Sequence, residues 1–352
     1  MSSFDAVGLS IASIIGSQLR QKGADPLIKR MTLFAFALAA AMQAAPARAV
    51  EPPLRIGYSD WPGWVAWQVA IDKGWLQQAG INPEFQWFDY SASLDAYAAG
   101  KLDGVLVTNG DALVTSGNGA RNVMMLVTDY SNGNDMIVAR PGLRDLHALK
   151  GKKVGVEVGL VEHLLLLDGL KQAGMAESDV TLVNTKTNET PQVLASGEVA
   201  AIGAWQPNCG AAMRAVPGAR PVFTSAQEPG LIYDGLAVTP VSLARRRPDY
   251  EKLMKVWYRV VAYIDDPATQ DDAVRIMAAR VGVAPAVYKK LLGGTRLLPP
   301  ADARRVLHEA PGFGSLYGSS QIADDFNVRN AVYKTHQDIH AAIDPSLTQQ
   351  QR

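Results

Sequence analysis

The feature that most constrains the fold is a regular alternation of short apolar strands with helical segments. The first half of the alternation predicts strands at 54–58, 83–88, 104–107 and 123–128, and helices at 64–78, 91–99 and 111–116. Strands joined by helical crossovers run parallel, because the crossover returns the chain to the same end of the sheet. This part of the chain therefore predicts one parallel or mixed sheet with helices packed against it.

The same alternation restarts after Pro141 and Gly142. It predicts strands at 153–157, 180–184, 201–204 and 235–238, and helices at 161–173, 190–196, 208–215, 250–264 and 271–279. A chain of 352 residues is longer than one hydrophobic core usually fills. The predicted fold class is therefore α/β, with two α/β lobes and a ligand cleft between them.

The N-terminal segment has the pattern of a secretory signal peptide. Lys29 and Arg30 precede an apolar run at 32–45, which ends in the small residues around Ala49. A basic start, a short apolar stretch and a small-residue cleavage site are the parts of such a peptide. We expect residues 1–49 to be removed by cleavage after Ala49, with the mature protein in the periplasm. Whether translation starts at Met1 or Met31 stays open, and a membrane anchor is the alternative.

Charge and cysteine content exclude several classes of function. The full chain has 34 Lys and Arg against 34 Asp and Glu, without the basic stripe that a nucleic-acid surface needs. Cys209 is the only cysteine, so an intramolecular disulfide is excluded, and no cysteine at the cleavage site could carry a lipid. The histidines lack metal-site spacing. We expect no metal, no cofactor and no nucleic-acid partner.

The predicted strand-to-helix turns hold the candidate ligand contacts. In open α/β sheets, ligands bind beyond the carboxyl ends of the strands, where such turns converge. These turns are rich in Gly, Asn, Asp and Trp. The predicted binding residues are Asp60, Trp61, Trp64, Asn109, Asp111, Asp135, Glu157, Glu162, Trp205 and Asp234.

Five segments, in order and spacing, resemble the nitrate/sulfonate/taurine class of periplasmic solute-binding proteins of ABC importers. They are 54–58 (LRIGY), 72–75 (DKGW) with 79–81 (AGI), 99–104 (AGKLDG), 149–156 (LKGKKVGV) and 204–207 (AWQP). The resemblance covers the whole mature chain. It implies the type II two-lobed periplasmic binding fold, a monomer that closes on its ligand by hinge motion, and an ABC permease in the inner membrane as partner.

The resemblance also implies how the lobes divide. Lobe 1 would comprise 50–135 and 240–352, and lobe 2 would comprise 136–239. The hinge crossings would lie near 134–140 and 231–239. The family is one of binding proteins, so we expect no enzymatic activity, and the sequence has none of the usual nucleophile or phosphate-binding motifs.

One turn departs from the anion-binding members of this class, which tend to present hydroxyl residues at the first helix of the second lobe. Here the segment 159–162 reads GLVE, and the predicted turns carry acids but no arginine. Carboxylates and indoles favour a cationic or donor-rich ligand, such as guanidine, urea or an amine. The alternatives are an aliphatic sulfonate, taurine or nitrate, a thiamine-pyrimidine precursor binder or synthase-like protein, and an extracytoplasmic sensor.

Several candidate residues also have a purely structural interpretation. Asp60 is a suitable N-cap for the helix that follows it, and Asp135 is suited to a turn. Trp67 is expected in the core, whereas Trp61 and Trp64 lie early enough to face the cleft. Cys209 is expected to be a small buried side chain.

Overall fold

The structure is a computed structural model that describes residues 51–351. The predicted signal peptide, residues 1–49, lies outside the described residues. The residues from Pro53 onward form one compact unit. Within residues 51–351, no helix is both long enough and apolar enough to span a bilayer.

A six-stranded mixed sheet forms the first lobe, in the order β11-β4-β10-β3-β1-β2. Its strands are β1 (Arg55–Tyr58), β2 (Glu84–Trp87), β3 (Gly104–Thr108), β4 (Val123–Ser131), β10 (Tyr233–Val238) and β11 (Thr295–Leu297). β1 runs parallel to β2 and β3, while β10 is antiparallel to both β3 and β4. Strand β10 therefore returns the chain to the centre of this sheet after the second lobe is complete.

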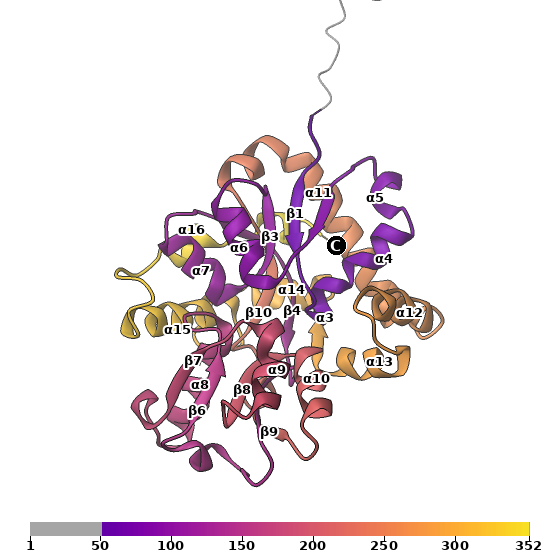
Figure 1. Cartoon of the computed structure of the whole chain (residues 1–352). Helices are drawn as coiled ribbons and strands as arrows, with labels where there is room; N and C mark the ends of the chain where they lie inside the picture. The colour runs from indigo at the N-terminus through magenta and orange to yellow at the C-terminus, as the bar shows by residue number, and fades with distance from the viewer. Residues whose placement is uncertain (1–50, 352) are drawn as a thin grey trace, which may run out of the picture. The chain divides into compact units, whose positions relative to one another are not determined.

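A five-stranded sheet forms the second lobe, in the order β7-β6-β8-β5-β9. Its strands are β5 (Asp135–Ala139), β6 (Lys153–Val156), β7 (Thr181–Asn184), β8 (Ala201–Trp205) and β9 (Arg220–Thr224). Its helices are α8 (Val161–Gln172), α9 (Thr190–Ser196) and α10 (Asn208–Ala215). In Figure 1 these magenta elements lie below the indigo strands β1 and β3. Two α/β units with separate sheets agree with the predicted fold class.

The remaining helices belong to the first lobe or follow it. They are α3 (Pro62–Val65), α4 (Trp67–Asp72), α5 (Trp75–Gln78), α6 (Tyr90–Ala98), α7 (Asn109–Gly117), α11 (Pro240–Asp265), α12 (Gln270–Arg280), α13 (Pro285–Gly293), α14 (Pro300–Val306), α15 (Leu316–Arg329), α16 (Ile339–Ala342) and α17 (Ser346–Gln349). The helix predicted at 64–78 is in fact α3, α4 and α5. The chain breaks before α5 because Gly74 takes a left-handed conformation, φ +67°.

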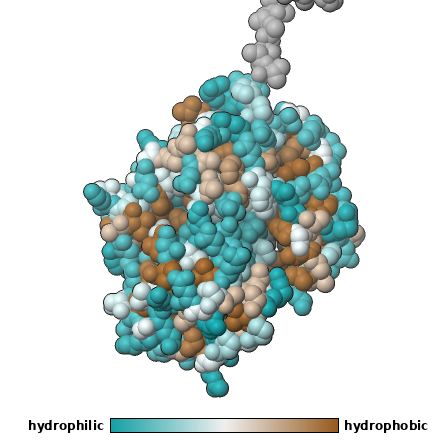
Figure 2. Space-filling model, in the orientation of Figure 1, coloured by the Kyte–Doolittle hydropathy of each residue, from teal (hydrophilic) through white to brown (hydrophobic). Residues whose placement is uncertain are grey.

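Trp67 and Cys209 are the two residues that the sequence predicts in the core. Trp67 is fully buried, with its ring 5.1 Å from Phe85 and 5.0 Å from Trp257. Cys209 is also fully buried and lies against the carbonyl oxygen of Ala204. Both predictions of a core position are confirmed. On the face in Figure 2, hydrophilic residues separate small groups of hydrophobic ones.

The two passages between the sheets lie side by side. The chain leaves the first sheet after Ser131 and enters the second at Asp135, and it returns between Thr224 and Tyr233. The Ser131 hydroxyl bonds the Ser225 hydroxyl at 2.6 Å, and this bond joins the two passages. The predicted lobe boundaries and hinge positions stay predictions, because the described structure is a single conformation.

Candidate ligand-binding cleft

The side chain of Asp60 links the first lobe to the second at the mouth of the cleft. Its carboxylate accepts a hydrogen bond from Trp205 Nε1 at 2.9 Å and another from Asn208 Nδ2 at 2.8 Å. It does not cap α3, whose N-cap is Trp61 without a side-chain bond. The capping prediction is wrong because the carboxylate turns toward the other lobe. The arrangement makes Asp60 a latch between the lobes.

Asp111 forms a second link between the lobes, deeper in the cleft. Its Oδ2 accepts a 2.7 Å bond from the Tyr90 hydroxyl and a 3.4 Å bond from the backbone N–H of Val161. Val161 is the first residue of α8, where free N–H groups and the helix dipole attract negative charge. Burial raises the pKa of Asp111 to about 7. This carboxylate thus occupies the anion position at the start of α8.

A first pair of carboxyl groups lies at the cleft edge of the six-stranded sheet. Asp234 in β10 is directly opposite Asp129 in β4, next to a β-bulge. Trp61 Nε1 donates to Asp129 Oδ1 at 2.8 Å. Burial raises the pKa of Asp129 to about 7, and burial with the charge of Asp129 raises that of Asp234 well above its usual range.

A second pair lies at the edge of the five-stranded sheet. Asp135 begins β5, so the alternative of a turn residue is wrong, and Glu162 lies in the first turn of α8. Burial raises the pKa of Asp135 to about 6. Burial, followed by the charge of Asp135, raises the pKa of Glu162 well above its usual range. Glu162 is fully buried.

These two pairs are short of hydrogen-bond donors. Five of their buried oxygens have no donor within the described protein: Oδ2 of Asp129, Asp135 and Asp234, and both Oε atoms of Glu162. Buried carboxylates without donors are costly, because the charge loses its hydration without compensation. The pairs therefore need shared protons or a bound group with several N–H donors.

Aromatic rings enclose this region. The Trp64 ring stacks on Tyr90 with centroids 5.4 Å apart, and Tyr90 also meets the edge of Trp205 at 5.2 Å. Trp61 and Trp64 are almost completely buried. Close approach is also required of Gly63, since a Cβ at that position would overlap the Asp129 carboxyl group. The Pro-Gly sequence between the two indoles is thus fitted to the acidic pair.

A small cavity opens at the mouth beside these rings. Its volume is about 60 Å³, and Asp60, Tyr90, Glu157 and Trp205 are in its wall. Trp205 is buried and also lines this cavity, and its predicted role in ligand binding stays a prediction. Glu157 accepts a 3.4 Å bond from the Thr187 hydroxyl, and burial raises its carboxyl pKa.

Asn109 is the predicted contact whose side chain is already fully engaged. Its Nδ2 donates to the Ser319 hydroxyl at 3.0 Å, and its Oδ1 accepts from the backbone N–H of Tyr233 at 3.1 Å. These bonds tie α7 to α15 and β10. The geometry favours a structural role for this amide.

Sequence reasoning did not select Asp129, Tyr90 or Asn208. Asp129 was recognisable from the sequence only as the start of an Asn- and Asp-rich turn. Its importance comes from the strand pairing with Asp234, which joins positions far apart in the sequence. Tyr90 and Asn208 carried no signal beyond their place at the start of predicted helices.

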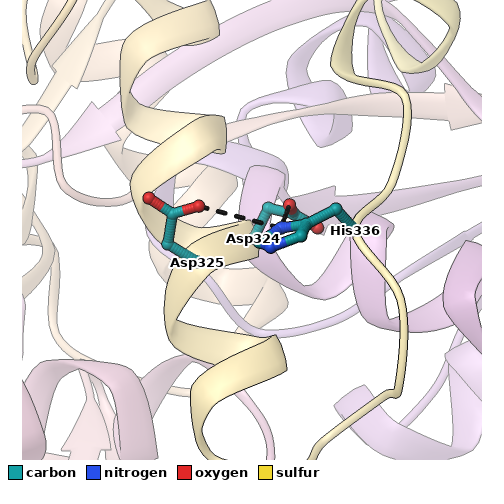
Figure 3. A group of neighbouring side chains, drawn as sticks. All are labelled: Asp324, Asp325 and His336. Carbon is teal, nitrogen blue, oxygen red and sulfur yellow. Dashed lines mark hydrogen bonds and ion pairs between the residues drawn. The ribbon is translucent and has the colours of Figure 1, made fainter.

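Figure 3 shows a separate group, Asp324, Asp325 and His336, whose potential ligand atoms lie within 4.8 Å of one another. The Asp324 carboxylate already accepts bonds from the Tyr333 hydroxyl at 2.8 Å and the Gln337 N–H at 2.9 Å, and it pairs with His336. These bonds fasten the segment after α15 to that helix, so the group has a sufficient structural role.

Known binding proteins are similar to this chain in sequence. A binding protein of Brucella abortus (strain 2308) is 30% identical over 193 residues, which cover 54% of this chain and 60% of the relative. The chain thus matches less than two thirds of that relative's length.

Solved structures share the fold. The alkanesulfonate-binding protein of Xanthomonas axonopodis pv. citri, bound to MOPS, has a TM-score of 0.70 at 19% identity, with 84% of this chain and 99% of that one covered. The periplasmic nitrate-binding protein of Synechocystis PCC 6803 has a TM-score of 0.69 at 12% identity, with coverages of 84% and 87%. The desulfurization enzyme DSZB has a TM-score of 0.60 at 16% identity, with coverages of 85% and 98%. The model of the NMT1-like family matches residues 47–278. The chain belongs to the NMT1-like family and has the two-lobed fold of periplasmic binding proteins.

Proposed function

We propose that this protein is the solute-binding component of an ABC importer and that its cleft captures a small nitrogenous solute of the guanidine, urea or amine type. It would act as a periplasmic monomer and deliver the solute to a permease in the inner membrane. The names of the relatives as binding proteins and the shared fold support the transport role.

The main support for a nitrogenous ligand is the shortage of hydrogen-bond donors around the two carboxyl pairs. In the described part of the chain, no Lys, Arg or His forms a hydrogen bond or ion pair with Asp129, Asp135, Glu162 or Asp234. A flat cation with several N–H groups would satisfy these oxygens with charge-assisted hydrogen bonds. The rings of Trp61, Trp64 and Tyr90 supply faces on which such a cation is attracted.

The anion alternatives fit the cleft less well. A sulfonate or nitrate would bring negative charge to a region that already holds several buried carboxyl groups. The N-terminus of α8, the natural place for an anion, is taken by Asp111 of the first lobe. Aliphatic sulfonates, taurine and nitrate therefore remain the alternative that binding measurements must exclude.

The enzyme alternative lacks a reactive thiol. Cys209 is the only cysteine of the chain, and burial raises the pKa of its thiol well above the usual range. A thiol held in the protonated form is a poor nucleophile. The structural likeness to a desulfurization enzyme therefore supports a common fold, and we propose a binding role without catalysis.

Binding would close the cleft. A ligand that contacts both carboxyl pairs bridges the two lobes, and it stabilises the closed form by its higher affinity for that form. Asp60 and Asp111 would hold the two lobes together through their hydrogen bonds across the cleft, while the ligand occupies the site between the lobes.

Thermal-shift screening followed by calorimetry tests the proposal. The panel should contain guanidinium, urea, methylamine, taurine, an alkanesulfonate, nitrate and an aminopyrimidine. Ligands that bind only the folded protein raise its melting temperature. We expect the largest shift with a nitrogenous solute. Tight binding of taurine or an alkanesulfonate, without any response to guanidinium, urea or methylamine, would refute the ligand class and leave the transport role intact.

Two acid-to-amide changes refine this test. Glu157→Gln at the mouth and Glu162→Gln in the second pair should each weaken the binding of guanidinium more than the binding of urea, because only the cation loses a charge interaction. Asp95→Asn, on an exposed residue of α6, is the matched control and should bind like the parent protein.

A further inference from the structure

All four carboxyl groups of the two pairs are buried, and five of their oxygens lack a hydrogen-bond donor within the described residues. Asp129 and Asp234 are directly opposite on neighbouring strands. Ionised carboxylates have only acceptor atoms, and their burial without donors is costly. This arrangement therefore favours a proton on each pair.

The groups that face the pairs from other elements do not supply positive charge. They are Trp61 of the turn after β1, Asp111 of α7, Glu157 after β6, Cys209 of α10 and Tyr288 of α13. All are acids or neutral donors. Among the described residues, Lys186 lies near Glu157 but forms no ion pair or hydrogen bond with either carboxyl pair. The protein thus leaves the neutralisation of the pairs to protons or to a ligand.

We propose that the cleft takes up its cation in exchange for protons: each carboxyl pair holds a shared proton while the cleft is empty and releases it to solvent when the N–H groups of the cation take its place. This inference rests on the proposed function, since only a cationic ligand can replace a proton. The exchange involves no covalent bond. One cation enters, and protons leave to the buffer.

The titration of the four groups supports the exchange. Burial raises the pKa of Asp129 to about 7 and that of Asp135 to about 6, and it raises the pKa of Asp234 and of Glu162 well above the usual range. The pairs therefore retain protons at a higher pH than exposed carboxyl groups do. A cation placed beside them favours the ionised forms and lowers the pKa values again.

Calorimetry in buffers of different ionisation enthalpy measures the exchange directly. The protein should be expressed from the full chain and titrated with guanidinium chloride and with methylamine at neutral pH. We expect release of up to about two protons per cation, one from each pair, and an affinity that rises by up to about a hundredfold per pH unit between pH 6 and 8. Urea, which is neutral, should release few or no protons and show a much flatter pH profile.

The outcomes separate the two proposals. If a cation binds with the same heat in every buffer and with an affinity independent of pH, the exchange is wrong while the proposed function stands. If neither guanidinium nor methylamine binds, both the ligand class and the exchange are wrong.

Amide variants assign the protons to the pairs. Glu162→Gln and Asp234→Asn each keep a donor for the partner carboxylate, so both should fold, and a melting curve checks this. Each change should reduce the number of protons released, and the double variant should release almost none. Asp95→Asn should release as many as the parent protein. An unchanged proton count in both single variants and in the double variant would overturn the assignment.

Discussion

The acids that link the lobes and the acids of the two pairs are the same residue type used in opposite ways. Asp60, at the mouth, is satisfied by Trp205 and Asn208, and Asp111, deeper in the cleft, is satisfied by Tyr90 and Val161. In the interior, Asp234 and Glu162 have buried oxygens without a donor from the described protein. The difference teaches that a count of acids in a cleft does not identify a ligand site. The acids that lack donors are the ones available to a ligand.

The largest expected effect comes from removing a charge in the interior. Asp129→Asn replaces the carboxylate that Trp61 holds in position with a neutral amide. A hydrogen bond to a charged group contributes about 1.5–3 kcal/mol, so guanidinium affinity should fall by roughly 10- to 150-fold. Calorimetry with guanidinium and urea measures the loss. An equal loss for both ligands would show that Asp129 acts on structure and not on the charge of the ligand.

Removing the charge at the mouth should cost less and should not depend on the ligand. Asp60→Asn weakens the bonds to Trp205 and Asn208, and so destabilises the closed form for every solute alike. We expect a loss of roughly three- to tenfold, since each weakened bond contributes about 0.5–1.5 kcal/mol. Asn208→Ala removes part of the same contact and should reproduce the effect. A loss of affinity confined to guanidinium would show that Asp60 contacts the ligand and does not act only as a latch.

The sequence predicted the alternation of strands and helices because apolar periodicity and Gly positions are local properties. It predicted the wrong continuous helix at 64–78, where the left-handed Gly74 breaks the chain. It also did not predict β9 and β11, whose pairing partners β5 and β4 lie far away in the sequence.

The candidate site was predictable to a similar degree. Most acids of the cleft follow predicted strands, so their position in the turns was visible. Which of them were satisfied was not visible, because the donors to Asp60 come from residues 145 and 148 positions away. The role of Asp129 likewise depends on its register with Asp234. Tertiary pairing, and not residue type, separates the latch from the unsatisfied pairs.

A smaller effect is expected on the stability of the empty protein. Burial raises the carboxyl pKa of Asp111 and Asp129 to about 7 and that of Asp135 to about 6, from 3.8. The folded protein then binds more protons than the unfolded chain between about pH 4 and pH 7, so its stability falls as pH rises through that window. The melting temperature should drop by a few degrees from pH 5.5 to pH 7.5, and saturating guanidinium should reduce the drop. A rise over this range would contradict the buried acidic interior.

The smallest effect should come from the indole that stacks without bonding. Trp61 Nε1 donates to Asp129, whereas the buried Trp64 Nε1 has no acceptor although its ring stacks on Tyr90. Guanidinium and amines offer no acceptor to that N–H, and phenylalanine keeps an aromatic face. Trp64→Phe should therefore change guanidinium affinity by only about twofold, whereas Trp61→Phe should lose a charge-assisted bond and several-fold more. Urea has a carbonyl oxygen that can accept from Trp64 Nε1. If Trp64→Phe weakens the binding of urea strongly and leaves the binding of guanidinium almost unchanged, the unpaired N–H distinguishes neutral from cationic solutes. If it weakens the binding of both solutes alike, the ring acts through packing alone.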